Sequence, residues 1–214
     1  MISGRISIAV CACLAVSACG GGGGGGGNEE RRVTTALRVT SEPLPAVADP
    51  QRALSLSGES VELSEEFTAG EEIVPTSNLD GRATYTGVAT FVRGGLDSGI
   101  AALGRLTLDA DFDSREISGD ISDFASSSEQ FRVSGELDVV NGEILSGADD
   151  GRFDADLEGD LNVNGSNRQV TGGMEGIFTG NDAQAVAGSV NVDPIDGLSD
   201  DSTEGFFVAT DRFR

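Results

Sequence analysis

The chain has 214 residues and a formal net charge of −22, from 36 acidic and 14 basic residues. This acidity excludes nucleic acid as a partner, because phosphates are bound by basic surfaces. If the negative charge serves binding and not solubility alone, it favours a basic protein as the ligand. Because the chain also lacks His and Lys, Ser-His-Asp and Cys-His catalysis, Schiff-base lysines and imidazole metal sites are excluded, so we expect neither an enzyme nor a cofactor.

The first nineteen residues predict an exported protein. Arg5 lies in a short, positively charged N-terminal region. The apolar run 6–16 is about as long as the hydrophobic region of a secretory signal peptide, but it is shorter than the ~20 residues that span a bilayer. Small residues follow at Ser17 and Ala18, and the next residue is Cys19. We expect residues 1–18 to be a signal peptide cleaved after Ala18, the alternative being an ordinary signal peptide with an incidental cysteine.

The segment Val16-Ser17-Ala18-Cys19 resembles the bacterial lipobox. The resemblance implies cleavage before Cys19 and acylation of both its thiol and its new amino group. The protein would then be attached to the membrane by a lipid anchor. Two or more acyl chains make such an anchor long-lived. Since Cys11 and Cys13 would be removed, the mature chain would have no internal disulfide. The residue directly after Cys19 is Gly20, and not the acidic residue that is associated with retention in the inner membrane. We therefore expect the protein to be anchored in the outer membrane, and its display at the cell surface stays open.

Residues 19–50 predict a tether and linker. The eight glycines at 20–27 form a flexible coil with an r.m.s. reach of roughly 15 Å. Pro43, Pro45 and Pro50 then predict an extended linker. In the accessory segment 51–80, apolar and polar residues alternate over 53–57 and 60–64 around Gly58-Glu59, which predicts a hairpin with a two-residue turn.

Residues 81–214 predict one all-β domain. Apolar and polar residues alternate with a period of two between Gly/Asn/Asp/Ser clusters, which is typical of antiparallel strands around a single core. Eight strands fit a small closed antiparallel barrel, with an eight-stranded sandwich as the alternative. The expected strands are 83–93, 103–112, 116–122, 131–139, 152–163, 168–179, 183–192 and 204–211.

The expected strands have an apolar face and an acidic face. Turns are predicted at 113–115, 141–142, 164–167 and 181–182. Glycines in the apolar register are expected at the tight interior of the barrel: Gly87, Gly119, Gly135, Gly159, Gly172, Gly176 and Gly188. The inward residues of three strands are expected to be Leu106, Leu108, Ala110 and Phe112; Phe131, Val133, Leu137 and Val139; and Phe153, Ala155, Leu157, Leu161 and Val163. A carboxylate-rich outer face and few aromatic residues favour a water-soluble barrel over one that sits in the membrane.

Several segments resemble the β-barrel domain of transferrin-binding protein B. The family's opening G-x-A-x-Y-x-G strand resembles Gly81-Arg82-Ala83-Thr84-Tyr85-Thr86-Gly87, and its closing strand resembles residues 205–209. Its L-x-x-D-F…I-S-G hairpin resembles residues 106–112 followed by 117–119, and its G-x-F-x-G…A-x-G hairpin resembles residues 176–180 with 187–188. The resemblance covers about 81–211. It implies a lipid-anchored single-barrel member that binds a protein ligand, in nutrient or iron acquisition.

Few residues qualify as ligands of a metal or of haem. Tyr85 and Met174 are the candidates for haem, although Tyr85 on an alternating strand also fits a barrel residue. Two stretches resemble the start of an EF-hand loop, Asp109-x-Asp111-x-Asp113 with Asp120, and Asp160-x-Asn162-x-Asn164-Gly165 with Thr171. Both also fit a strand that runs into a hairpin turn, so calcium binding stays open.

Two functions therefore remain from sequence. The first is a surface-displayed lipoprotein whose barrel is a binding module for a protein ligand. The second is an envelope lipoprotein with a structural or accessory role and no external ligand. The oligomeric state is open in both.

Overall fold

The computed structural model describes residues 49–67, 72–93, 100–126, 132–194 and 203–211. The predictions for Ala18, Cys19 and the glycine tether lie outside these residues. The described elements are α1 (Pro50–Phe67), η1 (Thr76–Asn78), β1 (Arg82–Arg93), β2 (Ile100–Asp111), β3 (Glu116–Ala125), β4 (Val133–Ile144), η3 (Gly147–Asp149), β5 (Arg152–Val163), β6 (Ser166–Thr179), η4 (Asn181–Ala183), β7 (Ala185–Pro194) and β8 (Thr203–Thr210).

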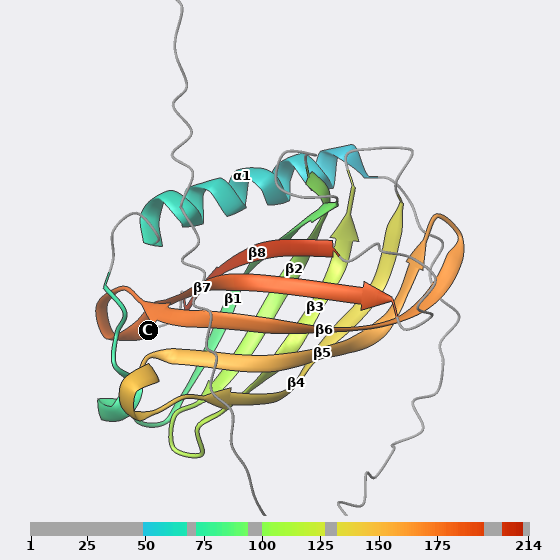
Figure 1. Cartoon of the computed structure of the whole chain (residues 1–214). Helices are drawn as coiled ribbons and strands as arrows, with labels where there is room; N and C mark the ends of the chain where they lie inside the picture. Colours follow the sequence, from blue (N-terminus) through green and yellow to red (C-terminus); the bar gives the residue numbers. More distant parts are fainter. Residues whose placement is uncertain (1–48, 68–71, 94–99, 127–131, 195–202, 212–214) are drawn as a thin grey trace, which may run out of the picture. The chain divides into compact units, whose positions relative to one another are not determined.

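The eight strands form a closed antiparallel barrel in chain order (Figure 1). β8 returns to pair with β1, from Thr86 opposite Thr210 to Arg93 opposite Thr203. This closure confirms the predicted eight-stranded barrel over the sandwich. Closure leaves the sheet without open edges, which suits a fold made of many short strands.

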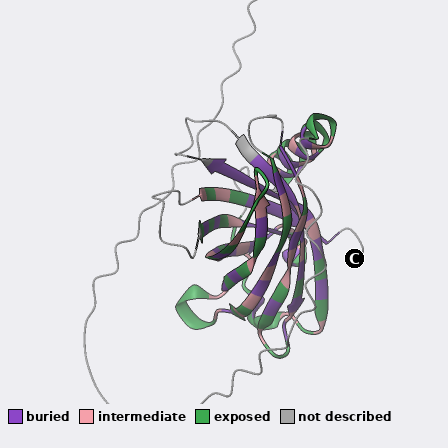
Figure 2. Ribbon diagram, turned by 90° about the vertical axis from the view of Figure 1, so that its right-hand side faces the viewer, coloured by how far each residue is buried: buried purple, intermediate pink, exposed green. Residues whose placement is uncertain are grey.

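The interior of the barrel is filled by the apolar register of the strands. Figure 2 shows buried and exposed residues alternating along the strands. The inward residues expected from the sequence are buried, among them Leu106, Leu137 and Leu157, while Val163 is partly buried and Phe131 lies outside the described residues. Each fully buried Leu contributes ~1.5–3 kcal/mol of burial free energy.

A Cβ at any of the glycines in the apolar register would come closer than 3.0 Å to an atom of a neighbouring strand. Gly176 on β6 is paired with Gly188 on β7, and the rings of Phe153 and Phe207 pack over this pair. A Cβ at Gly176 would lie 2.5 Å from the Phe153 ring, and one at Gly188 would lie 2.0 Å from the Glu175 carbonyl oxygen. The absence of side chains at these positions is therefore a packing requirement.

One end of the barrel, here called the Tyr85 end, carries the connections 112–115, 145–151 and 180–184. Three rings pack there around Phe178, whose centroid lies 5.4–6.0 Å from those of Tyr85, Phe112 and Phe153. Residues 72–81 attach to this end, because the Val74 N–H donates to the Phe178 carbonyl and the Thr76 N–H and hydroxyl both donate to Asp150.

The hairpin predicted within 51–80 is wrong, because Pro50–Phe67 is the helix α1. Asp49 accepts a hydrogen bond from the Arg52 N–H at 2.9 Å, as an N-cap does, and Pro50 occupies the first helical position and is not part of an extended linker. The alternation of Leu and Ser over 53–57 also fits a helix. Its buried residues, Ala53, Leu56, Ser60 and Leu63, have helical spacing.

The helix α1 lies on the outer wall of the barrel (Figures 1 and 2). Ala53 and Leu56 pack against outward-facing Val88, Leu103 and Ala125. Leu63 packs against Ala187 and Val208 farther along the helix. This cover explains why successive residues from Val88 to Val92 are all buried, although only every second one faces the interior.

One of the predicted turns is part of a strand. The turn predicted at 141–142 is wrong, because Asn141 and Gly142 form a bulge inside β4, and the chain turns instead at 145–151.

In the part of the chain that the structure describes, no helix is both long and apolar enough to cross a membrane.

Candidate functional site: an acidic outer face

The outward side chains of four consecutive strands, β3 to β6, form an acidic face. We define this acidic face as Glu116, Asp120, Glu136, Asp138, Glu143, Asp154, Asp156, Glu158, Asp160 and Glu175. The pattern that places them there is the period-two alternation, which points Leu157 and Leu161 inward and the intervening carboxylates outward. The sequence predicted this acidic face correctly for β4 and β5.

Carboxylates of neighbouring strands lie directly opposite one another on the acidic face. Glu143 is opposite Asp154, and Asp154 is in turn opposite Glu175. A second row places Asp138 opposite Asp120 on one side and Glu158 on the other. Like charges in directly opposed positions destabilise a sheet. A cation that lay against these opposed carboxylates would reduce any repulsion between them.

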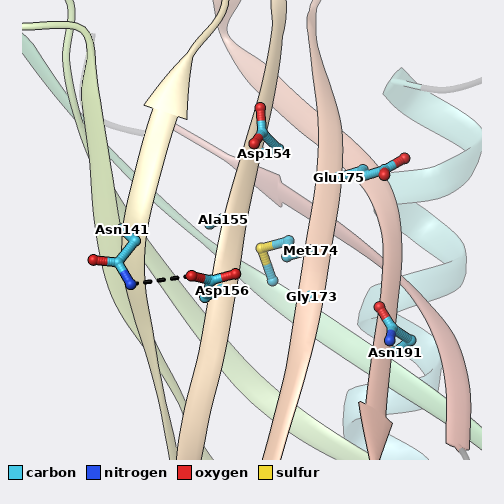
Figure 3. A pocket seen from close by; sticks show the side chains of 8 residues that line it. All are labelled: Asn141, Asp154, Ala155, Asp156, Gly173, Met174, Glu175 and Asn191. Atoms are coloured by element: carbon cyan, nitrogen blue, oxygen red, sulfur yellow. Dashed lines mark hydrogen bonds between the residues drawn. The ribbon is translucent and has the colours of Figure 1, made fainter. Parts of the chain in front are cut away.

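A hollow of about 290 Å³ lies within this region, across β4 to β7 (Figure 3). Gly173 adds no side chain to the hollow, and a Cβ at this position would make a tight contact of 3.2 Å with Asn191 Oδ1. The residues that line the hollow are Asn141, Asp154, Ala155, Asp156, Gly173, Met174, Glu175 and Asn191.

The bulge in β4 brings Asn141 to the edge of the hollow. Its backbone is left-handed, with φ at 52°, and its Nδ2 donates to Asp156 Oδ2 at 3.0 Å (Figure 3). A bulge of this kind redirects a side chain out of the regular alternation. The lining therefore consists mainly of carboxylate and carboxamide oxygens, which accept hydrogen bonds from guanidinium or ammonium groups.

Three arginines pair with carboxylates that are not part of the acidic face, and a fourth makes its contacts at the edge of that face. Arg105 pairs with Glu59 of α1, with nitrogen–oxygen distances of 2.6 and 3.0 Å. Arg52 of α1 pairs with Asp123, and Arg82 pairs with Asp111. Arg115 donates to the carbonyl oxygens of residues 144 and 145. The charges of Arg105, Arg52 and Arg82 are thus paired elsewhere on the barrel.

Neither residue considered for haem is exposed at a site. Tyr85 is fully buried, and its hydroxyl donates to the Ala183 carbonyl at 2.7 Å. Met174 is buried in the core and is also one of the residues that line the hollow. The structure therefore gives both side chains packing roles.

Side chains from both calcium candidates hold strands and turns together. Asp109 accepts from the Thr84 hydroxyl, and Asp111 accepts from the N–H groups of Asp113 and Ser114. The Ser114 N–H is the main cause of a lowered pKa for Asp111, with Arg82 adding to it. In the second candidate, Asn162 Oδ1 accepts from the Gly165 N–H and Asn164 Oδ1 from the Arg132 N–H.

Within the described ranges, no three His, Cys, Asp or Glu side chains are grouped so as to hold a metal ion. The acidic face is therefore a spread of single carboxylates and not a coordination sphere. Sequence reasoning missed Asn141, Gly173 and Asn191 as parts of the hollow, because a bulge and cross-strand register bring them together.

Neither a scan of protein-family models nor a search of curated proteins gives a match to this chain.

Proposed function

We propose that this protein is a lipid-anchored lipoprotein of the outer membrane, displayed at the cell surface, whose barrel binds a basic protein ligand. The observation that carries the binding part is the acidic face, where directly opposed carboxylates lie beside an open hollow. A ligand with Arg or Lys side chains would relieve the repulsion between carboxylates as it forms charge-assisted hydrogen bonds. The anchoring part rests on the lipobox resemblance at Cys19.

The packing of the barrel supports binding on the outer surface. Tyr85, Phe153, Phe178 and Phe207 occupy interior positions and are buried. Binding within such a core would require these rings to move. The resemblance to the barrel of transferrin-binding protein B supports a role in nutrient or iron acquisition through protein contacts.

Location and binding need separate experiments. Mass spectrometry of the mature protein from membranes tests the anchor, and the proposal expects an acylated Cys19 as the first residue. Protease treatment of intact cells tests display, and the proposal expects cleavage of the barrel. Protection of the barrel in intact cells, with cleavage only after lysis, would instead favour an envelope lipoprotein with a structural or accessory role.

The binding test compares two variants of equal charge. The first replaces Asp154, Asp156 and Glu175 by their amides, and the second does the same to Glu62, Glu65 and Glu66 on α1. A basic ligand of the acidic face should lose affinity for the first variant and keep most of it for the second. Equal losses would mean that net charge alone attracts cations, and the acidic face would then not be the binding site.

A further inference from the structure

The intrinsic preference of α1 for a helical conformation is weak. Gly58 lies in its middle, and a Cβ at this position would meet nothing within 4 Å, so no packing requirement explains the glycine. The last turn contains Glu65 and Glu66 and no basic residue, which is the unfavourable sign for the negative end of a helix dipole. Contacts with the barrel must therefore provide most of the stability of α1.

The buried contacts of α1 with the barrel lie along one stripe, and two ion pairs, Arg105–Glu59 and Arg52–Asp123, add to them. Three apolar side chains, those of Ala53, Leu56 and Leu63, are buried against the barrel. Ser60 Oγ lies 3.5 Å from Thr90 Oγ1. The Arg105–Glu59 pair is partly exposed, with side-chain exposures of 32% and 24%, so solvent weakens it.

The barrel does not need α1 for closure. The ladder between β1 and β8 completes it beneath the helix, and α1 contributes no strand. The core inside the barrel is a separate cluster from the two small clusters under α1. Loss of the α1 contacts would therefore leave the main core and every strand pairing in place.

The wall beneath α1 differs from the uncovered wall. Beneath α1 lie the outward apolar residues Val88, Leu103, Ala125, Ala187 and Val208, together with the polar Thr90 and Arg105 that contact the helix. The outward residues of β5, in contrast, are mainly carboxylates. Among the described residues, those of α1 cover this apolar strip.

We propose that α1 is a releasable helix, which opens as one unit from an intact closed barrel and uncovers this apolar strip. The occupant of the strip is α1 itself, and release and return take place in the native protein. Elements held by few apolar contacts open with smaller free energies than the core of a domain. The inference is independent of the acidic face and of its ligand.

Hydrogen exchange of backbone amides, followed by mass spectrometry on the full chain, tests the proposal. Amides of α1 should be protected, but should exchange faster than those of β5 and β6. Gly58→Ala should slow the exchange of α1 about fivefold, since Ala is the better helix former. Leu56→Ala should speed it by about a hundredfold through lost packing. Neither change should alter the exchange of β5 and β6.

A core variant is the matched control. Leu157→Ala removes packing inside the barrel, and should speed the exchange of β5 and β6 while leaving that of α1 unchanged. Two results would overturn the proposal. One is an acceleration of β5 and β6 by Leu56→Ala equal to that of α1, which would make the helix part of the barrel's cooperative unit. The other is a complete lack of protection in α1, which would mean that it is not docked in solution.

Discussion

The Tyr85 hydroxyl donates a 2.7 Å hydrogen bond to the Ala183 carbonyl, and both residues are buried at the Tyr85 end of the barrel. Ala183 has a left-handed backbone with φ at 57°, which is unfavourable for a residue with a Cβ. The hydrogen bond joins β1 to the connection between β6 and β7, which are distant in sequence. The phenol thus helps hold an unfavourable turn in place.

Tyr85→Phe should therefore destabilise the protein. The ring would still pack on Phe178, but the Ala183 carbonyl would lose its donor inside the core, at a cost of about 1–3 kcal/mol. Urea unfolding measures the change. Thr84→Ala, which removes an exposed hydroxyl hydrogen bond to Asp109, should cost less. Equal stabilities of Tyr85→Phe and the parent protein would remove the role given to this hydrogen bond.

Gly176→Ala and Gly173→Ala form a matched pair on β6. A Cβ at Gly176 would overlap the Phe153 ring, so this change should cost about 1–3 kcal/mol or more through overpacking. At Gly173 the nearest atom would be 3.2 Å away, on an exposed side chain that can move. Thermal unfolding should therefore show a large loss for the first variant and a small change for the second. Similar losses in both would mean that glycine content, and not the ring contact, decides the outcome.

The stability contributed by Asp150 should depend on pH. Its pKa lies below the ordinary value of 3.8, mainly because of a hydrogen bond from the Ser77 side chain, with Thr76 adding to it and desolvation opposing it. A pKa that is lower in the folded state means that the carboxylate stabilises the fold above about pH 3.8. This stabilisation is lost as the pH falls through the folded-state pKa.

Asp150→Asn should therefore be less stable than the parent at neutral pH, and the difference should vanish in acid. The free energy of urea unfolding of both proteins, measured from neutral pH downward, checks this. Asp149→Asn in the same connection should show a smaller difference. A difference between Asp150→Asn and the parent that stays constant below pH 3.8 would rule out the titration of Asp150 as its cause.

Removal of one carboxylate from a row of like charges should stabilise the free protein. Asp154 lies between Glu143 and Glu175, so Asp154→Asn should raise the unfolding free energy by roughly 0.2–1 kcal/mol at low salt. Added salt should reduce the gain, because it screens exposed charges. Glu62→Gln on α1 is the control. A loss of stability in Asp154→Asn would show that the opposed carboxylates do not repel one another appreciably.

The barrel could be predicted from the sequence because most of its strands bury only one face. In β5, inward Leu157 and outward Glu158 follow the period-two rule without interruption. The rule gives a weaker signal in β1, where α1 covers the outer side and Val88 is buried together with Ala89. Burial on both faces removes the contrast on which such a prediction depends.

The errors at α1 and Asn141 also have physical causes. The Leu-Ser alternation of 53–57 fits both a strand and a short part of a helix, and Asp49-Pro50 was the signal that decides between them. Asn-Gly is typical of hairpin turns, but its left-handed Asn also suits a bulge. The hollow depends on this bulge and on the register of four strands, which pairwise sequence patterns do not determine.

The most direct test of the central claim is the affinity of the purified protein for a deca-arginine peptide, measured by titration calorimetry at several salt concentrations. We expect the variant with amides at Asp154, Asp156 and Glu175 to bind the peptide more weakly than the variant with amides at Glu62, Glu65 and Glu66, although their net charges are equal. Equal affinities of the two variants would contradict a binding role for the acidic face.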